Sequence, residues 1–358
     1  MNALTSRIAH LIRMQGPISV AQFMSMALHD PELGYYATHD PIGARGDFIT
    51  APEISQMFGE LLGAWIVQAW RDQGCPTPAR LVELGPGRGT LVADALRAAK
   101  LDPEFLKSIE VVLVEMSASL RQAQAEKLKA APVAIHWFDK FDESLTDQPL
   151  FLLANEFFDA LPIRQFFFTE RGWCERRVGV GQSGELVFML SPAPVPLHLP
   201  HERGAPKAGD VYEVCPSGEA IVEQVASVVS DKGGAVLIID YGYTDVGFGE
   251  TLQAVSQHKY ASVLDNSGES DLSTHVDFAA LARTAERSGA KAHGPVDQGA
   301  LLRALGIEQR AERLMAANPD HRDAIASSVE RLVSPQAMGT LFKALAIVPR
   351  HASKPPGF

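Results

Sequence analysis

The sequence predicts an α/β protein built on a doubly wound, mainly parallel β-sheet. Short apolar segments alternate with helical segments from residue 80 onward, and the first apolar segment ends in a glycine-rich turn. A further apolar segment at 233–243 resumes the pattern after an insertion. With 358 residues, the chain is long enough for one elaborated domain or for two.

Residues 1–74 are predicted to form a mostly helical segment. The stretches "SVAQFMSMAL" and "APEISQMFGELLGAWIVQAWRD" carry apolar residues at helical spacing. The stretch between them, "GYYATHDPIGARGDFIT", is rich in glycine and aromatic residues and predicts a loop. Thr50 is placed to cap the second helix, and Pro52 suits its first turn.

Residues 75–358 are predicted to form the core around five strands. The strands are expected at 80–84, 110–116, 133–138, 149–157 and 233–243. Helices at 90–100 and 117–131 follow the first two strands. Between the fourth and fifth strands, an inserted region of about 163–210 begins with strands joined by turns and ends in a proline-rich connection. A helix at 216–234 then leads into the fifth strand.

Composition and charge exclude several classes of protein. The net charge is −11, from 32 basic and 43 acidic residues, which argues against a nucleic-acid-binding protein because that class needs a basic face. Cys75, Cys174 and Cys215 are far apart and lack C-x-x-C spacing, so neither a disulfide scaffold nor a metal site is expected. Without a membrane-length apolar run or a recognisable targeting segment, the sequence predicts a cytoplasmic protein that does not insert into membranes.

The glycine turn "LVELGPGRGTL" indicates the type of cofactor. Glu83 lies near the end of the first strand, and glycines follow at 85, 87 and 89. A dinucleotide site needs G-x-G-x-x-G and a Walker loop needs G-K-[ST], and neither is present. The spacing E-x-G-x-G-x-G resembles motif I of class I methyltransferases that use S-adenosylmethionine (SAM). A plain strand-to-helix turn, in which Gly85, Gly87 and Gly89 serve only the backbone, is the alternative.

The strand ends that follow supply candidate residues for SAM. Glu83 is placed to pair with the methionine ammonium, and Glu115, at the end of the second strand, to accept from both ribose hydroxyls. Phe138 and Asp139, at the end of the third strand, are candidates for packing on adenine and bonding its amino group. The alternatives are a helix-capping or solvated Glu115 and a core role for the residues after the third strand.

The N-terminal segment adds three candidates for the cofactor site. Asp47, Thr50 and Glu53, in "GDFITAPE", could close over SAM. Turn and cap chemistry for the helix that starts near Pro52 is the alternative interpretation of these residues.

Three polar residues interrupt the apolar stretch "LFLLANEFFDALPIRQFFF". Asn155, Glu156 and Asp159 come just after the predicted fourth strand. A buried carboxylate is costly unless it is paired or faces a ligand, and the C-terminal edge of an open parallel sheet is where ligands bind. The sequence therefore predicts that these residues face the methyl group and its acceptor. Alternatively, Asn155 and Glu156 cap a helix at "FFDAL", and Asp159 pairs with Arg164.

Together these residues resemble the MidA-type SAM-dependent methyltransferases, a family that includes the mitochondrial arginine methyltransferase acting in assembly of respiratory complex I. The matching stretches are "GYY", "GDFITAPEISQMFGELLGAW", "ELGPGRGTL", "ANEFFDALPIRQF", "LIIDYGY", "DLSTHVDFAAL", "LGI" and "MGTLFKALAI". The resemblance implies a class I, Rossmann-like, seven-stranded fold. In that fold, residues 1–74 pack over the cofactor site, the insertion lies on the substrate side, and "AKAHGPVDQGALLRALGI" and "MGTLFKALAIVPR" supply the last two strands.

The resemblance also implies methyl transfer to an arginine side chain of a protein, which in the mitochondrial case is a core subunit of complex I. Glu156 is then the first choice for gripping the guanidinium and Asp159 the second, while Asn155 can hold the SAM ammonium or the acceptor through its carbonyl. Two other classes stay open: an assembly or binding protein with a SAM-type fold but no turnover, and a small-molecule methyltransferase.

Overall fold

The computed structural model describes most of the chain as two compact units. The described residues are 2–39, 50–197, 199–200, 203–244, 247–256 and 259–358. The first unit comprises residues 1–48, 159–218 and 245–277. The second unit comprises residues 49–158, 219–244 and 278–358. The predicted helical segment 1–74 is therefore divided between them, because its last helix belongs to the second unit.

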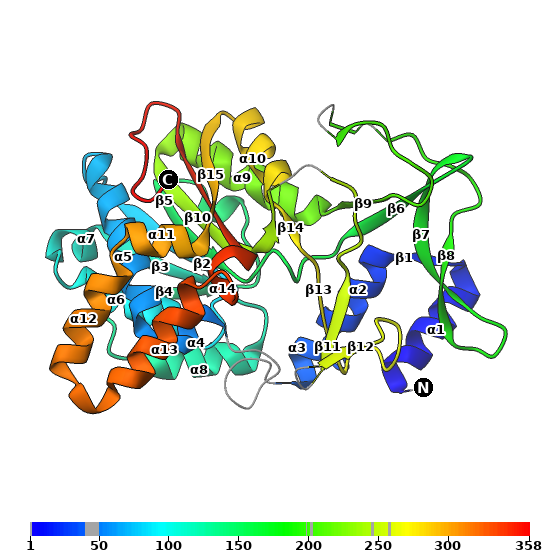
Figure 1. Ribbon diagram of the computed structural model, residues 1–358, viewed down its shortest axis with the longest axis horizontal. Coiled ribbons are helices and arrows are strands. Elements are labelled where there is room, and N and C mark those ends of the chain that lie inside the picture. The colour runs from blue at the N-terminus through cyan, green and yellow to red at the C-terminus, as the bar shows by residue number, and fades with distance from the viewer. Residues whose placement is uncertain (1, 40–49, 198, 201–202, 245–246, 257–258) are drawn as a thin grey trace. The chain divides into compact units, whose positions relative to one another are not determined.

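The second unit is built on the predicted sheet, whose strands run in the order β15-β16-β10-β5-β2-β3-β4 (Figure 1). Their bounds are β2 Ala79–Leu84, β3 Ile109–Val114, β4 Ile135–Phe138, β5 Leu150–Asn155, β10 Gly234–Tyr243, β15 Ala290–Asp297 and β16 Phe342–Pro349. The strands β10, β5, β2, β3 and β4 are parallel, whereas β16 is antiparallel to β10 and to β15. All five predicted strands and the two C-terminal strands are confirmed.

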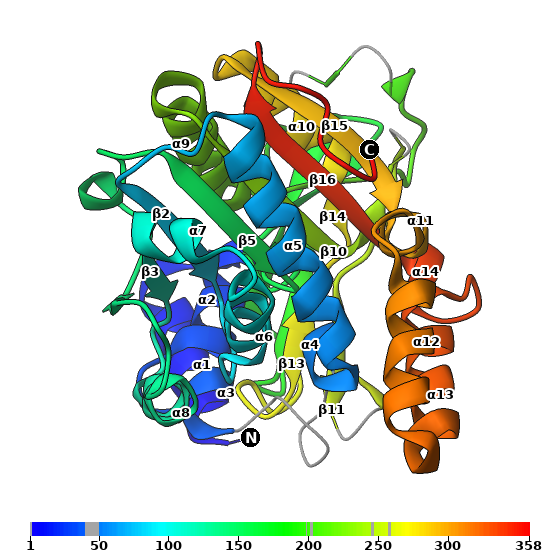
Figure 2. The ribbon, with the colours of Figure 1, turned by 90° about the vertical axis from the view of Figure 1, so that its left-hand side faces the viewer.

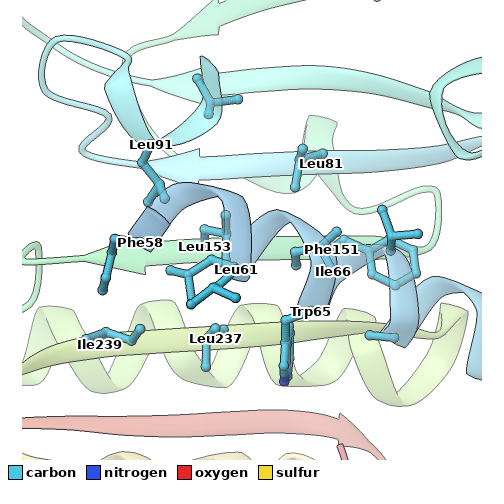
Figure 3. Packing of buried hydrophobic residues seen from close by; sticks show 14 of the residues in the cluster. Phe58, Leu61, Trp65, Ile66, Leu81, Leu91, Phe151, Leu153, Leu237 and Ile239 are labelled. Carbon is cyan, nitrogen blue, oxygen red and sulfur yellow. The ribbon is translucent and has the colours of Figure 1, made fainter. Parts of the chain in front are cut away.

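The helices of this unit join and cover the strands. They are α4 Ala51–Ile54, α5 Gln56–Asp72, α6 Thr90–Ala99, α7 Pro103–Ser108, α8 Ala118–Leu128, α9 Pro216–Lys232, α10 Phe278–Arg287, α11 Gln298–Ala304, α12 Ile307–Ala317, α13 Arg322–Val333 and α14 Met338–Leu341. Figure 2 shows α5 crossing one face of the sheet. On that face Trp65 and Phe58 of α5 join Leu81, Leu153 and Leu237 of the strands in one buried cluster (Figure 3).

The predicted helix 51–72 is interrupted at Ser55. This residue has extended backbone angles, φ −159° and ψ 135°, and its side chain accepts a hydrogen bond from the Met57 N–H to start α5. The short helix α4 precedes it, with Pro52 in the first turn as predicted. Thr50 occupies the cap position of α4, but its side chain makes no capping hydrogen bond, so the predicted cap by Thr50 is wrong. The apolar spacing runs through the break, because it reports burial on both sides and not backbone continuity.

The first unit has its own sheets and its own core. Its helices are α1 Ala3–Gln15, α2 Val20–His29 and α3 Tyr35–Thr38. Its strands are β1 Ile18–Ser19, β6 Arg164–Thr169, β7 Gly172–Val180, β8 Leu186–Leu190, β9 Val211–Val214, β11 Gln253–Ser256, β12 Lys259–Ala261, β13 Asp271–Ser273 and β14 Val276–Asp277. One sheet has the order β1-β7-β6-β9 with β8 paired to β7, and a smaller sheet has the order β12-β11-β13. The insertion thus contains the predicted strands, and no strand occurs among the described residues of 191–210.

Helix α5 approaches α6 so closely that a side chain would not fit. A Cβ at Gly63 would lie 2.5 Å from the Cα of Ala95, and one at Gly59 would lie 2.6 Å from the Cβ of Asp94. Because Gly59 and Gly63 are four residues apart, they share one face of the helix. The contact therefore depends on backbone-to-backbone packing between the two helices.

We predict that Gly63→Ala destabilises the protein, although alanine is the better helix former. The added methyl would force α5 and α6 apart, at a cost of about 1–3 kcal/mol in the free energy of unfolding. The control is Ala64→Ser, which adds one heavy atom on the exposed side of the same helix. Thermal unfolding of the two variants should show a clear loss for the first and little change for the second. Equal melting temperatures would contradict the close-packing argument.

Candidate active site

The glycine turn after β2 has a backbone that only glycine adopts readily. Gly85, Gly87 and Gly89 have φ values of +62°, +53° and +74°, all in the left-handed region. A Cβ at Gly85 would also lie 2.8 Å from the Phe157 ring. The Gly85 N–H donates to the carbonyl of Val114 at 3.1 Å, which joins the turn to the end of β3. Helix α6 starts directly after the turn, so its N-terminal N–H groups gather at this edge of the sheet.

Glu83 is buried inside this edge as a carboxyl group with an unused acceptor. Its side chain is 3% exposed. Burial raises its pKa to about 8; a hydrogen bond from the Val92 N–H opposes the rise, and nearby Glu115 adds to it. Its Oε2 atom has no hydrogen-bond partner among the described residues. A buried acceptor of this kind is expected to find a donor, and a cation would satisfy it best.

Asn155 supplies a second unused acceptor, on the strand next to that of Glu83. In the pairing of β2 with β5, Glu83 lies opposite Leu153. Because side chains alternate along a strand, Asn155 lies on the same face of the sheet as Glu83, two residues further along. Asn155 is buried, and within the described chain its Oδ1 atom has no hydrogen-bond partner. Two such acceptors on adjacent strands suit an ammonium group, which carries three donors and a positive charge.

Glu156 adopts a backbone conformation that is uncommon outside glycine. Its φ is +52°, and its N–H donates to the carbonyl of Ile239 at 2.9 Å. Its Oε1 atom accepts hydrogen bonds from the Ala51 N–H at 2.9 Å and from Asn155 Nδ2 at 3.0 Å. The Glu156 carboxylate therefore caps the N-terminus of α4, where the Thr50 side chain makes no capping hydrogen bond. Non-glycine residues with positive φ concentrate at functional sites, where the surrounding structure holds them in place.

Asp240 of β10, near the C-terminal edge of the parallel strands, holds the turn that carries Glu156. It is fully buried in β10. Its Oδ2 atom accepts from the N–H groups of Phe157 at 3.1 Å and Phe158 at 2.9 Å, and its Oδ1 atom from the Tyr241 N–H at 2.9 Å.

No helix forms at 157–161, so the alternative in which Asn155 and Glu156 cap a helix there is wrong.

Asp159 begins a different unit of the chain from Glu156. Its backbone carbonyl accepts from the Thr274 N–H at 3.0 Å and from the Thr274 hydroxyl at 3.3 Å. Arg164 forms an ion pair with Glu175 at 2.8 Å. The proposal that Asp159 assists in acceptor binding stays untested.

The candidates for ribose and adenine lie on neighbouring strand ends. Glu115 follows β3, and its N–H donates to the carbonyl of Phe138, the last residue of β4, at 2.9 Å. Its Oε1 atom accepts from the Ser117 N–H at 2.8 Å, so Glu115 also supports the turn into α8. Asp139 forms an ion pair with Arg121 at 2.6 Å and is exposed. The structure thus brings Glu115, Phe138 and Asp139 together, and their roles toward a ligand stay predictions.

The candidates from the N-terminal segment differ in whether the structure describes them. Asp47 lies outside the described residues. Thr50 precedes α4, and Glu53 within α4 accepts a hydrogen bond from the Thr90 hydroxyl at 2.5 Å. Helix α4 therefore contacts the first residue of α6, directly after the glycine turn.

Among the residues that the structure describes, no group of three or more metal-ligating side chains was found.

The sequence reasoning missed Gln124. This residue of α8 is fully buried. Its Nε2 atom donates to the carbonyl of Gly87 at 2.7 Å, and its Oε1 atom accepts from the Trp137 indole at 2.8 Å. The only sequence signal for this role is weak, because α8 contains a second glutamine, Gln122, and half of its other residues are polar.

Comparison with known proteins gives consistent results. The family model Methyltransf_28, described as "Putative S-adenosyl-L-methionine-dependent methyltransferase", matches residues 61–296. Similar curated proteins include "Protein arginine methyltransferase NDUFAF7, mitochondrial" of Rattus norvegicus, 37% identical over 98% of this chain and 86% of that protein. The corresponding homolog of Drosophila melanogaster is 36% identical over 97% of this chain and 85% of that protein.

A similar solved structure comes from Burkholderia thailandensis and was determined with S-adenosyl-homocysteine bound. It has a TM-score of 0.85 and 28% identity, and the match covers 99% of this chain and 94% of that one. A native structure of a protein from the same organism has a TM-score of 0.83 and 27% identity, over 99% and 93% of the two chains.

We predict that Glu83 links the binding of S-adenosylhomocysteine (SAH), which carries the same ammonium group as SAM, to pH. In the ligand-free protein Glu83 is largely protonated below its pKa of about 8, and an adjacent ammonium favours the carboxylate. Binding below that pH therefore releases a proton, and affinity falls by up to about tenfold for each pH unit of acidification. Calorimetry in buffers of different ionisation enthalpy measures both effects.

The variant Glu83→Gln should bind SAH more weakly near pH 8 and lose this part of the pH dependence. Glu126→Gln, at an exposed position, is the matched control and should behave as the unmodified protein. If the unmodified protein releases no proton and Glu83→Gln binds as tightly, Glu83 does not hold the ammonium group.

Proposed function

Since this chain belongs to the family of S-adenosyl-L-methionine-dependent methyltransferases, we propose that it transfers the methyl group of SAM to an arginine side chain of a protein. The observation that supports this most is Glu156, a carboxylate at the C-terminal edge of the sheet, in a left-handed backbone conformation beside Asn155. The names of the curated relatives support arginine as the acceptor.

Four groups of residues would hold the cofactor, which supplies an activated methyl group on a sulfonium. Glu83 and Asn155 offer their unused oxygen atoms to the ammonium group. The glycine turn leaves room for a close approach of the ligand to the backbone. Glu115 would accept from the ribose hydroxyls, and Phe138 and Asp139 would contact adenine. Thr50, with Asp47, would contribute from the N-terminal side.

Glu156 would grip the arginine acceptor. The guanidinium stays protonated in proteins, and a carboxylate binds its planar fork through paired hydrogen bonds. Held in this way, one nitrogen can attack the methyl carbon in line with the sulfur. A C–N bond forms, the S–C bond breaks with its electron pair left on sulfur, and the nitrogen loses a proton to solvent. Asp159 would be a second group for the acceptor. Positioning of this kind can supply about 7 kcal/mol or more of the barrier.

The family resemblance leads us to propose a subunit of respiratory complex I as the protein acceptor. The similar curated proteins carry "mitochondrial" in their names, so the predicted cytoplasmic location of this chain has no support from them. Within the described part of the chain, no helix has the length and apolar character needed to cross a membrane.

We predict that Glu156→Gln strongly reduces methyl transfer while SAH binding survives. The amide of glutamine can still accept from the Ala51 N–H, so the start of α4 is kept, but it lacks the charge that grips a guanidinium. Transfer should fall by about 100-fold or more, which corresponds to about 2.7 kcal/mol, while the SAH dissociation constant stays within about threefold. The control is Glu143→Gln at an exposed position. Full transfer activity in Glu156→Gln would exclude the proposed role.

The acceptor is identified by incubating the protein and labelled SAM with extract of its own organism lacking the gene. We expect labelled methylarginine in a complex I subunit, located by mass spectrometry of peptides. Label confined to small molecules would instead establish a small-molecule methyltransferase. SAH binding without any labelled product would favour a binding protein that does not turn over.

A further inference from the structure

We propose that Gln124 is a positioning residue for the cofactor. It sets the conformation of the glycine turn after β2, residues 85–89, which we call the glycine loop, and connects this loop to the end of β4. Its side chain reaches two elements at once, through the bonds to the Gly87 carbonyl and the Trp137 indole. The inference rests on the cofactor of the family and not on the proposed arginine acceptor. SAH binding and hydrogen exchange therefore test it without any acceptor, and only the kcat measurement needs one.

Packing alone does not account for a glutamine at this position. A helix that covers a sheet normally buries an apolar stripe. The buried residues of α8 are Gln124 and Leu128, and Gln124 is the more deeply buried of the two. Burying an amide is tolerated when its hydrogen bonds are made, and here both its donor and its acceptor atom have partners. An aliphatic side chain would fill the same space without fixing either partner.

The bond to Gly87 controls the direction of the loop backbone. The peptide between Gly87 and Arg88 is trans, so the Gly87 carbonyl and the Arg88 N–H point in opposite directions. Anchoring the carbonyl on α8 therefore turns the Arg88 N–H to the other side of the loop. Since Gly87 has no Cβ and φ is +53°, its peptide could otherwise rotate at little cost.

Gln124 also connects the loop to the ribose and adenine candidates. Its Nε2 atom lies 3.5 Å from Glu115 Oε2, and Trp137 directly precedes Phe138 in β4. A Cβ at Gly89 would lie 3.3 Å from the Gln124 Cγ, so the loop packs directly on this side chain. Gln124 therefore contacts residues at or next to the ends of β2, β3 and β4, which are three of the four strand ends that we assign to the cofactor.

The test uses Gln124→Met, which keeps the volume but makes neither hydrogen bond. We expect the SAH dissociation constant to rise about 10- to 100-fold, which corresponds to about 1.4–2.7 kcal/mol. In the ligand-free protein, amide hydrogen exchange of residues 85–90 should be faster, and kcat at saturating SAM should change less than about threefold. The matched control, Gln122→Met, lies at an exposed position of the same helix and should change none of these.

The proposal is overturned if Gln124→Met binds SAH as tightly as the unmodified protein. It is also overturned if binding, kcat and melting temperature fall together, because that pattern marks a structural residue. A failure of arginine methylation with intact SAH binding would count against the proposed acceptor only.

A second variant, Gln124→Glu, tests the donated bond even if the first fails to fold. A carboxylate still accepts from Trp137 but donates to Gly87 only when protonated. The charged and titratable groups around this position include Glu115 and Arg121 of α8, whose Nε donates to the Glu115 carbonyl. Glu83 lies beyond Glu115, and Lys127 of α8 contacts Thr90. The SAH affinity of the unmodified protein divided by that of Gln124→Glu should approach one as pH falls from about 8 to about 6, because protonation of the new carboxylate restores the donor. A constant ratio would exclude a donor role.

Discussion

The carboxyl group of Asp240 makes the hydrogen bonds on which the proposed acceptor side of this site depends. It is fully buried and accepts hydrogen bonds from three backbone N–H groups, two of which belong to the turn after β5. These hydrogen bonds fix the turn in one conformation. They offset the backbone strain at Glu156, which would otherwise relax out of the left-handed region. Through Glu156, the same turn reaches Asn155 and the start of α4.

The cofactor side is organised by a different constraint, the lack of side chains in the glycine loop. This backbone is free to adopt positive φ but has nothing of its own to hold it there. The neighbouring elements supply the restraint: the Val114 carbonyl of β3 and the Gln124 amide of α8 both bond to it. Acids buried around this loop, Glu83 above all, remain costly until a cation is present.

The sequence predicts the central strands well because they are buried on both faces, which leaves continuous apolar runs such as Leu150–Ala154. It also predicts the glycine loop and the acids after β5, since these break the apolar pattern. Three features escaped it for physical reasons. The break at Ser55 leaves the apolar spacing unchanged, the left-handed Glu156 depends on a carboxylate more than 80 residues away, and a buried Gln124 looks like any surface glutamine.

One feature of the network gives the protein a built-in optical reporter. The chain has four tryptophans. Trp65 and Trp70 are buried with their indole N–H groups bonded to the carbonyls of Pro356 and Pro76, and Trp173 is buried in the first unit. Trp137 alone among them is only half-buried, and its indole is bonded to Gln124. Intrinsic fluorescence should therefore follow the state of the glycine loop without any added label.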